Sequence, residues 1–259
     1  ALATKQWALI AVLPALLATS TRRMALLGIA AAVAAALTLP ALIANLGGFE
    51  QVARSAAGHN SLGASTTPEN LWWPLADRVQ VAVVGERYMA PAWVATVAHP
   101  LIVLAPIPLA VLLWLRPGRR RDDALGLLTL CLLLRCLLDQ WNNDYYHLPF
   151  LLSLLAWETV RRPGVPRFTL AAAILLGLSF WPEQTRIFAD SLASAPLRFA
   201  LYVAWAVPFA AGVALALYRP TALEAARAEY HRRRGAAPRP AAVRDRADHG
   251  RRGEHAGQP

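Results

Sequence analysis

The run D-Q-W-N-N-D-Y-Y-H, residues 139–147, lies between two almost wholly apolar segments, LGLLTLCLLLRCLL at 125–138 and LPFLLSLLAW at 148–157. A chain reversal needs only a few polar residues. This one carries two acids, three amides, three aromatic rings and a histidine. Long apolar runs joined by short polar turns indicate helices that cross a membrane. The stretch therefore predicts a turn at a lipid–water boundary that is rich enough in hydrogen-bonding groups to hold a polar ligand.

The composition of the whole chain also indicates a membrane protein. Of its 259 residues, 56% are hydrophobic and 16% are charged, with a mean hydropathy of +0.37. Soluble domains carry more charge than this. We predict an all-α fold, a polytopic transmembrane helical bundle formed by residues 1–218. Its seven candidate spans are 6–20, 24–46, 94–115, 124–138, 148–160, 168–182 and 197–218.

Arginine placement predicts the orientation of this bundle. The arginine-rich segments are 21–23, 116–123, 161–167 and the tail after residue 218. With seven spans these are alternate connections, so they share one side, which the positive-inside rule makes cytoplasmic. We expect a multi-pass protein of the plasma membrane whose active face is extracytoplasmic. The connections expected on that face are 47–93, 139–147 and 183–196.

The net charge of +10 does not indicate a nucleic-acid-binding protein. Residues 219–259 hold ten arginines against five acids, which is half of the excess charge. This placement follows membrane topology rather than a binding groove, so nucleic acid is not an expected partner. The tail is rich in Arg, Ala and Pro and is predicted to be disordered. Because the chain begins at Ala1, we expect it to be the C-terminal part of a longer membrane protein.

The polar turn supplies the main candidate binding residues: Asp139, Asn143, Asp144, Tyr145 and His147. Carboxylates and amides bind sugar hydroxyls, and aromatic rings stack on the apolar face of a sugar ring. An aspartate or histidine can also take a proton from an acceptor hydroxyl. A second interpretation stays open, in which the rings form an interfacial aromatic belt and the acids face water.

Residues outside the turn are further candidates. Arg135 lies one helical turn before Asp139 within an apolar run, where an ionisable residue usually faces a partner. It could clamp a phosphate, form an i, i+4 ion pair with Asp139, or do both. Lys5, the only lysine, contacts a lipid phosphate or snorkels to the membrane surface. Trp72 and Trp73, with Glu69 and Asn70 just before them in the sequence, are a substrate-facing platform or interfacial anchors. No metal-ligand spacing and no nucleotide-binding motif occurs, so no metal or cofactor is expected.

Two expectations concern local structure rather than binding. Glu158, near Arg161 and Arg162, is predicted to form an ion pair at the cytoplasmic end of its span. Thr66 or Thr67, just before a proline and an acid, is predicted to cap a short helix.

Three short motifs carry a resemblance to a known family: A-T-K-Q-W at 3–7, N-L-W-W-P-L at 70–75 and D-Q-W-N-N-D-Y-Y-H-L-P-F-L-L at 139–152. With the alternating apolar helices, they resemble the C-terminal half of actinobacterial glycosyltransferase family 87 proteins of the GT-C superfamily. That family includes polyprenol-phosphate-mannose-dependent mannosyltransferases. The resemblance implies a GT-C-like bundle that moves a hexose, mannose in that family, from a polyprenyl-phosphate donor to a lipid or glycan acceptor.

The resemblance also implies roles for individual residues. Lys5 and Arg135 would contact the donor phosphate, and the loop 47–93 would close the cavity. The residues that would line the sugar or acceptor site are Asp139, Asn143, Asp144, Tyr145 and His147. The catalytic acid of such enzymes lies in a first outer loop that no part of this chain matches, so the catalytic residue is unknown. The expected reaction is an inverting displacement.

Two other classes of protein stay open. A transporter or flippase of a polar or lipid-linked substrate would also place polar residues in an apolar bundle, typically near the middle of broken helices and in repeated halves. Here the polar residues collect at one face and no repeat is visible, which favours the enzyme. A scaffolding protein would explain the tail but not Arg135 or the polar turn.

Overall fold

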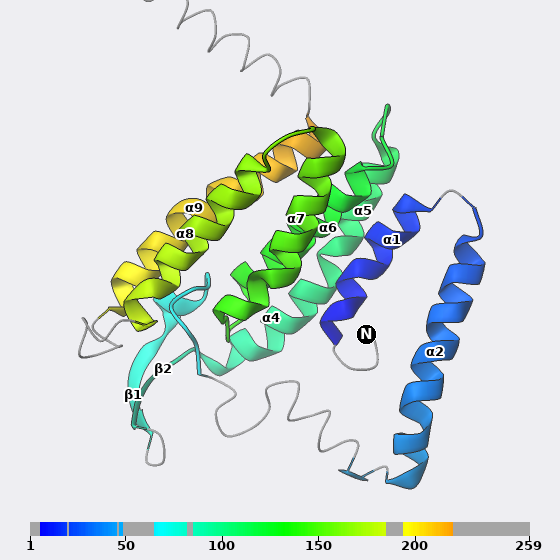
Figure 1. Ribbon diagram of the computed structural model, residues 1–259. Coiled ribbons are helices and arrows are strands. Elements are labelled where there is room, and N and C mark those ends of the chain that lie inside the picture. Colours follow the sequence, from blue (N-terminus) through cyan, green and yellow to red (C-terminus); the bar gives the residue numbers. More distant parts are fainter. Residues whose placement is uncertain are drawn as a thin grey trace, which may run out of the picture. The chain divides into compact units, whose positions relative to one another are not determined.

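The computed structural model describes residues 6–19, 21–45, 47–48, 65–81, 85–184 and 194–219, and these residues are mostly helical (Figure 1). The helices are α1 (Val12–Ala18, preceded by the 3-10 turn η1, Gln6–Ala11), α2 (Arg23–Ala44), α4 (Ala92–Leu104), α5 (Pro106–Leu115), α6 (Asp123–Leu138), α7 (Leu148–Arg161), α8 (Arg167–Gln184) and α9 (Ala195–Tyr218). Two further 3-10 turns are η2 (Trp73–Leu75) and η3 (Asp144–His147).

Each of the seven predicted apolar blocks forms a helix or a pair of helices. The block 94–115 forms the pair α4 and α5, which meet at Pro106, where proline has no N–H to continue the first helix's hydrogen bonding. Among the residues that the structure describes, three helical segments are long and apolar enough to cross a membrane, namely Arg23–Ala44, Ala92–Leu115 and Ala195–Tyr218. The helices α6 and α7, of 16 and 14 residues, are shorter than the roughly 20 residues of a perpendicular crossing.

A small antiparallel hairpin departs from the all-α prediction. Strands β1 (Asp77–Val81) and β2 (Gly85–Met89) pair in the register Asp77 to Met89 and Val81 to Gly85. Gly85 has a φ of 78°, a left-handed conformation that glycine adopts without steric cost. The hairpin lies within the connection 47–93, for which only a short helix was predicted.

Helix α6 is the centre of the bundle because nearly its whole circumference is buried. It contacts α7, α9, α1 and α4, and Figure 1 shows α7 running beside it. Leu133 and Leu137 of α6 pack with Phe150 of α7 and Tyr202 of α9 in the largest apolar cluster of the described residues. The cluster extends to Phe180 of α8. The apolar faces of α6 to α9 therefore fix the position of the turn that joins α6 to α7.

Gly126 allows this close packing. A Cβ at this position would lie 2.6 Å from the Trp157 ring and 2.8 Å from Leu217. We expect Gly126→Ala to lower the free energy of unfolding by about 1–3 kcal/mol, the usual cost of overpacking. Thermal unfolding in detergent measures this. Gly212→Ala is the matched control, because a Cβ there meets no atom within 4 Å; equal melting temperatures for the two variants would contradict the account.

Ion pairs join the arginine-rich connections at one end of the bundle. The Asp123 carboxylate, fully buried, accepts hydrogen bonds from Arg116 and Arg161. Arg161 also pairs with Asp122 at 2.7 Å, and Arg116 donates to the carbonyl of Leu217 near the end of α9. These contacts bring the connection before α6 together with the ends of α7 and α9, as alternating spans require.

The prediction that Glu158 forms an ion pair with a neighbouring arginine is wrong. Its carboxylate instead accepts the backbone N–H groups of Phe168 and Thr169, both at 3.0 Å, and the Thr169 hydroxyl at 3.0 Å. The first turn of a helix leaves its N–H groups without intrahelical partners, and its positive end favours a carboxylate. Glu158 thus caps the start of α8, while Arg161 binds the two aspartates before and at the start of α6.

Candidate functional site

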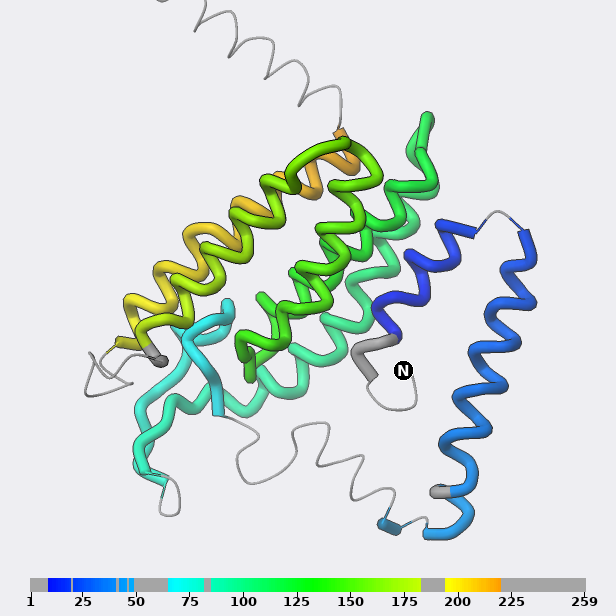
Figure 2. Tube along the Cα trace, in the orientation of Figure 1, coloured from blue at the N-terminus to red at the C-terminus, as the bar shows by residue number. Residues whose placement is uncertain are grey.

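The segment 65–75 lies against the polar turn 139–147 at the opposite end of the bundle from these ion pairs. Thr67 donates its backbone N–H to Gln140 at 3.1 Å and its hydroxyl to the Asn142 carbonyl at 3.1 Å. The hydroxyl of Thr66 likewise reaches the Gln140 carbonyl at 3.1 Å. The helix cap predicted for these threonines is therefore wrong: their hydroxyls bond to the other loop. Figure 2 shows this segment in cyan beside the start of α9.

Asn70 is the central link between the two loops. Its side-chain nitrogen donates to the Gln140 carbonyl at 2.9 Å and to the Thr66 hydroxyl at 3.0 Å, and its oxygen accepts the Trp72 N–H at 2.9 Å. A reciprocal hydrogen bond comes from the turn, where the Asn142 side chain donates to the Glu69 carbonyl at 2.6 Å. A fully buried amide with this many partners specifies one arrangement of the two loops.

A buried ion pair ties the same segment to α9. Arg198 donates to the Glu69 carboxylate at 2.5 Å, and the two side chains are 5% and 0% exposed. Sequence reasoning missed Arg198. It grouped Glu69 with Trp72 and Trp73 as a substrate-facing platform or interfacial anchors, and did not predict its ion pair. The signal for Arg198 was present, because an ionisable residue inside an apolar run usually faces a partner, which was the reason for selecting Arg135. Nothing in the spacing of Glu69 and Arg198, 129 residues apart, predicts that they meet.

Arg135 forms the predicted i, i+4 ion pair. Its Nη2 lies 2.9 Å from Oδ2 of Asp139, and both side chains are almost fully buried. The guanidinium also lies over the Tyr146 ring, 4.3 Å from its centroid, a cation–π contact. Burial raises the pKa of Asp139, and the charge of Arg135 opposes that shift. The ion-pair interpretation is confirmed, and the phosphate-clamp role stays a prediction.

His147 is buried behind the turn rather than exposed on it. Its Nδ1 lies 3.2 Å from the Asn143 carbonyl, which only accepts, so Nδ1 carries the proton. Nε2 then accepts the Tyr202 hydroxyl at 2.9 Å, and that hydroxyl accepts from Asn142 at 3.3 Å. Burial lowers the pKa of His147 to about 4. The imidazole is therefore neutral and bridges the turn to α9.

This neutral histidine predicts a loss of stability in acid. The unfolded chain binds a proton below a pKa of 6.5, whereas folded His147 binds one only near pH 4. Stability is therefore complete above pH 6.5 and falls as the pH drops toward 4, by roughly 3 kcal/mol in all from this group. Melting temperatures in detergent across this range test the prediction. His147→Gln should flatten the profile; an unchanged slope would contradict this origin.

Asp144 and Tyr145 are exposed residues of the turn, as is Trp141. Tyr145 is 63% exposed, and its N–H donates to Oδ1 of Asp144 at 2.7 Å. Asn143, half-buried, donates to the Tyr145 hydroxyl at 3.3 Å. The structure thus divides the predicted site residues into an inner set, formed by Arg135, Asp139 and His147, and an outer set, formed by Asn143, Asp144 and Tyr145.

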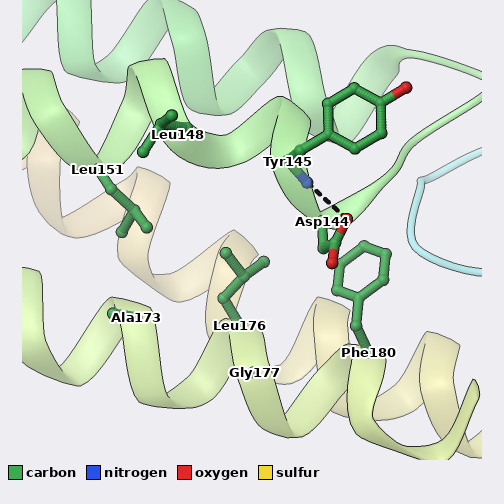
Figure 3. A pocket seen from close by; sticks show the side chains of 8 residues that line it. All are labelled: Asp144, Tyr145, Leu148, Leu151, Ala173, Leu176, Gly177 and Phe180. Carbon is green, nitrogen blue, oxygen red and sulfur yellow. Dashed lines mark hydrogen bonds between the residues drawn. The ribbon is translucent and has the colours of Figure 1, made fainter. Parts of the chain in front are cut away.

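Two residues of the outer set, Asp144 and Tyr145, line a groove of about 370 Å³ between α7 and α8, here named the α7–α8 groove (Figure 3). Asp144 and Tyr145 lie at one end of it, next to Phe180. Its remaining lining residues are apolar or small: Leu148, Leu151, Ala173, Leu176, Gly177 and Phe180. A groove that is polar at one end and apolar along its walls suits an amphiphile whose head group stays at the water boundary.

Trp72 and Trp73 are half-buried and packed. The Trp72 indole N–H donates to the Leu138 carbonyl at 2.6 Å, and its ring meets the edge of Trp93. Trp73 packs between Tyr88 of the hairpin and Phe199 of α9, with ring centroids 5.3 and 5.1 Å away. Both rings pack within the protein, and the two interpretations, substrate-facing platform and interfacial anchor, stay open. Lys5 and residues 220–259 lie outside the described residues.

Within the described ranges, no group of three or more His, Cys, Asp or Glu side chains is close enough to hold a metal ion. No protein-family model, curated protein or solved structure matches the chain.

Proposed function

We propose that this protein is an integral-membrane glycosyltransferase with a GT-C-like bundle. It moves a hexose, with mannose as the first candidate, from a polyprenyl-phosphate donor to a lipid or glycan acceptor. The reaction takes place at the end of the bundle that holds the polar turn, and the arginine-rich connections at the other end make that face extracytoplasmic. The observation that carries the proposal is the α7–α8 groove, which begins at Asp144 and Tyr145 and continues between apolar helices.

The chemistry needs hydrogen-bonding groups at the lipid–water boundary. An acceptor hydroxyl gives its proton to a base, its oxygen bonds to the anomeric carbon, and the bond from that carbon to the phosphate oxygen breaks. Cationic groups stabilise the negative charge that develops on the leaving phosphate. Asp144 lines the groove and is placed to hold a sugar or acceptor hydroxyl, and Arg135 lies directly behind the turn.

Two features support an enzyme over a transporter. The buried charged side chains of the described residues lie at the two ends of the bundle, around the polar turn with the segment 65–75 and around Asp123 and Glu158. They do not lie in the middle of broken helices, where transporters place them. The inner set is also joined to α9 through Tyr202 and to the segment 65–75 through Asn142. A turn fixed in this way holds its outer residues in one geometry, which transfer chemistry requires.

Replacement of Asp144 tests the proposal. We expect Asp144→Asn to reduce the rate of sugar transfer by about 100-fold, within the range that a positioned acid or base contributes, with little effect on melting temperature because the side chain is exposed. The measurement follows labelled mannose from polyprenyl phosphate into extractable lipid and glycan. Asp77→Asn, an exposed aspartate on β1 outside the groove, is the control. Equal rates for both variants would exclude Asp144 from the site.

A further inference from the structure

A second charged region lies at the end of the bundle opposite the polar turn. It consists of the connection 116–123 and the segment 158–167, which ion pairs hold together and which we name the arginine-rich end. We infer that the arginine-rich end binds the head-group phosphate of an anionic phospholipid in the surrounding membrane. The inference does not depend on the proposed reaction, because no residue of this region lines the α7–α8 groove.

The charge balance of this region carries the first step. The region holds seven arginines against three acids, and all three acids are occupied. Asp122 and Asp123 pair with arginines of the region, while Glu158 accepts the first N–H groups of α8. The excess of positive charge favours an anion over a water molecule, and basic clusters at the ends of membrane helices are where anionic lipids bind.

Two guanidinium groups in the connection 116–123 carry the second step. Nε of Arg116 and Nη1 of Arg119 are buried, and neither has an acceptor among the described residues. The other two nitrogens of Arg116 donate to Asp123 and to the Leu217 carbonyl, so this guanidinium is held in one orientation. A buried charged donor without an acceptor costs free energy. A phosphate, with several acceptor oxygens, removes that cost through charge-assisted hydrogen bonds.

Exposed apolar side chains next to these arginines indicate a lipid rather than a free anion. In the last turn of α5, Leu112, Trp114 and Leu115 are exposed. They directly precede Arg116, at the point where the segment Ala92–Leu115, which is long and apolar enough to cross a membrane, ends. A lipid whose phosphate meets the arginines would lay its hydrocarbon chain along these side chains, which removes apolar surface from water.

Native mass spectrometry of the delipidated protein in detergent measures the binding. Phosphatidylglycerol, which is anionic, and phosphatidylcholine, which has no net charge, are added separately with identical hydrocarbon chains. We expect phosphatidylglycerol to bind with a dissociation constant about tenfold lower, the difference that one charge-assisted hydrogen bond supplies. Equal dissociation constants for the two lipids would overturn the inference.

The substitution Arg119→Gln tests where the lipid binds. Because Asp122 and Asp123 pair with other arginines, these ion pairs stay in place, and we expect an unchanged melting temperature. The dissociation constant for phosphatidylglycerol should rise about tenfold, since a charge-assisted hydrogen bond is lost. The matched control, Arg87→Gln, removes the same charge from an exposed position on β2 and should bind the lipid as the unmodified protein does. An unchanged dissociation constant in Arg119→Gln, or an equal rise in both variants, would overturn the inference.

Two more measurements distinguish a lipid from a free anion. Sodium phosphate, added at the same concentration as phosphatidylglycerol, should leave the lipid bound, because inorganic phosphate lacks the hydrocarbon chain. Leu115→Asn keeps every charge and should raise the dissociation constant of the lipid about fourfold, the contribution of roughly one buried methylene group. Displacement of the lipid by phosphate would overturn the inference and identify a site for free phosphate. An unchanged dissociation constant in Leu115→Asn would contradict the contact between the lipid and α5.

Discussion

Arg198→Ala is expected to lower the free energy of unfolding by about 3–5 kcal/mol, the cost of removing one partner of a buried ion pair. The Glu69 carboxylate is fully buried, and the substitution removes the cation that lies 2.5 Å from it. The same contact holds the segment 65–75 against α9. Because this segment also packs against the polar turn, the substitution should expose part of the turn to solvent. Chemical unfolding in detergent measures the first effect, and protease cleavage within 65–75 measures the second.

A double substitution separates the charge from the packing. Glu69→Gln combined with Arg198→Met leaves neither charge buried, and we expect it to be more stable than Arg198→Ala alone. Arg162→Ala, an exposed arginine at the end of α7, should change stability by no more than about 0.5 kcal/mol. If the double variant loses as much unfolding free energy as Glu69→Gln alone and Arg198→Met alone lose together, the two residues do not act as a unit.

Arg135→Ala is expected to abolish sugar transfer, by at least about 100-fold, while leaving membrane insertion intact. The guanidinium pairs with Asp139 and supports the Tyr146 ring, next in sequence to the outward-facing Asp144 and Tyr145. A guanidinium can also bind a phosphate oxygen. Labelled transfer measures the first effect, and protease protection of the loops in membranes measures the second.

The double variant Arg135→Ala with Asp139→Asn distinguishes the two roles of Arg135. Removal of both charges relieves the buried carboxylate, so a purely structural ion pair predicts that transfer returns to within about tenfold of the unmodified protein. A phosphate clamp predicts that the double variant stays inactive. Unmodified turnover by Arg135→Ala alone would contradict both roles.

The lengths of the apolar blocks predicted where several of the helices begin and end. The block 124–138 became Asp123–Leu138 and the block 168–182 became Arg167–Gln184, so the boundaries agree within two residues. Long uninterrupted apolar runs leave few alternatives to helix, because every backbone polar group must be satisfied within the segment. The hairpin Asp77–Met89 was missed because its strands have five residues each, too few to alter a pattern sought over span-length windows.

The sequence located the polar turn but not which of its side chains face the interior. Asp139, at the end of α6, is buried beside Arg135. Within η3, Asp144 and Tyr145 are exposed and His147 is buried, because the turn directs successive residues to different sides. The partner of His147 is Tyr202 on α9, and a contact between residues so distant in the chain leaves no pattern in the spacing. Tertiary packing decides this division, and single-sequence periodicity does not encode it.

The most direct test of the central claim uses membranes that carry the protein and polyprenyl-phosphate mannose labelled in its sugar. The account predicts that label passes into extractable lipid or glycan and that Asp144→Asn prevents it. Parallel donors that carry glucose or arabinose cover the case of another sugar. Label that crosses the bilayer on its original polyprenyl carrier, with no new glycoside formed from any of the three donors, would contradict the transferase and identify a flippase.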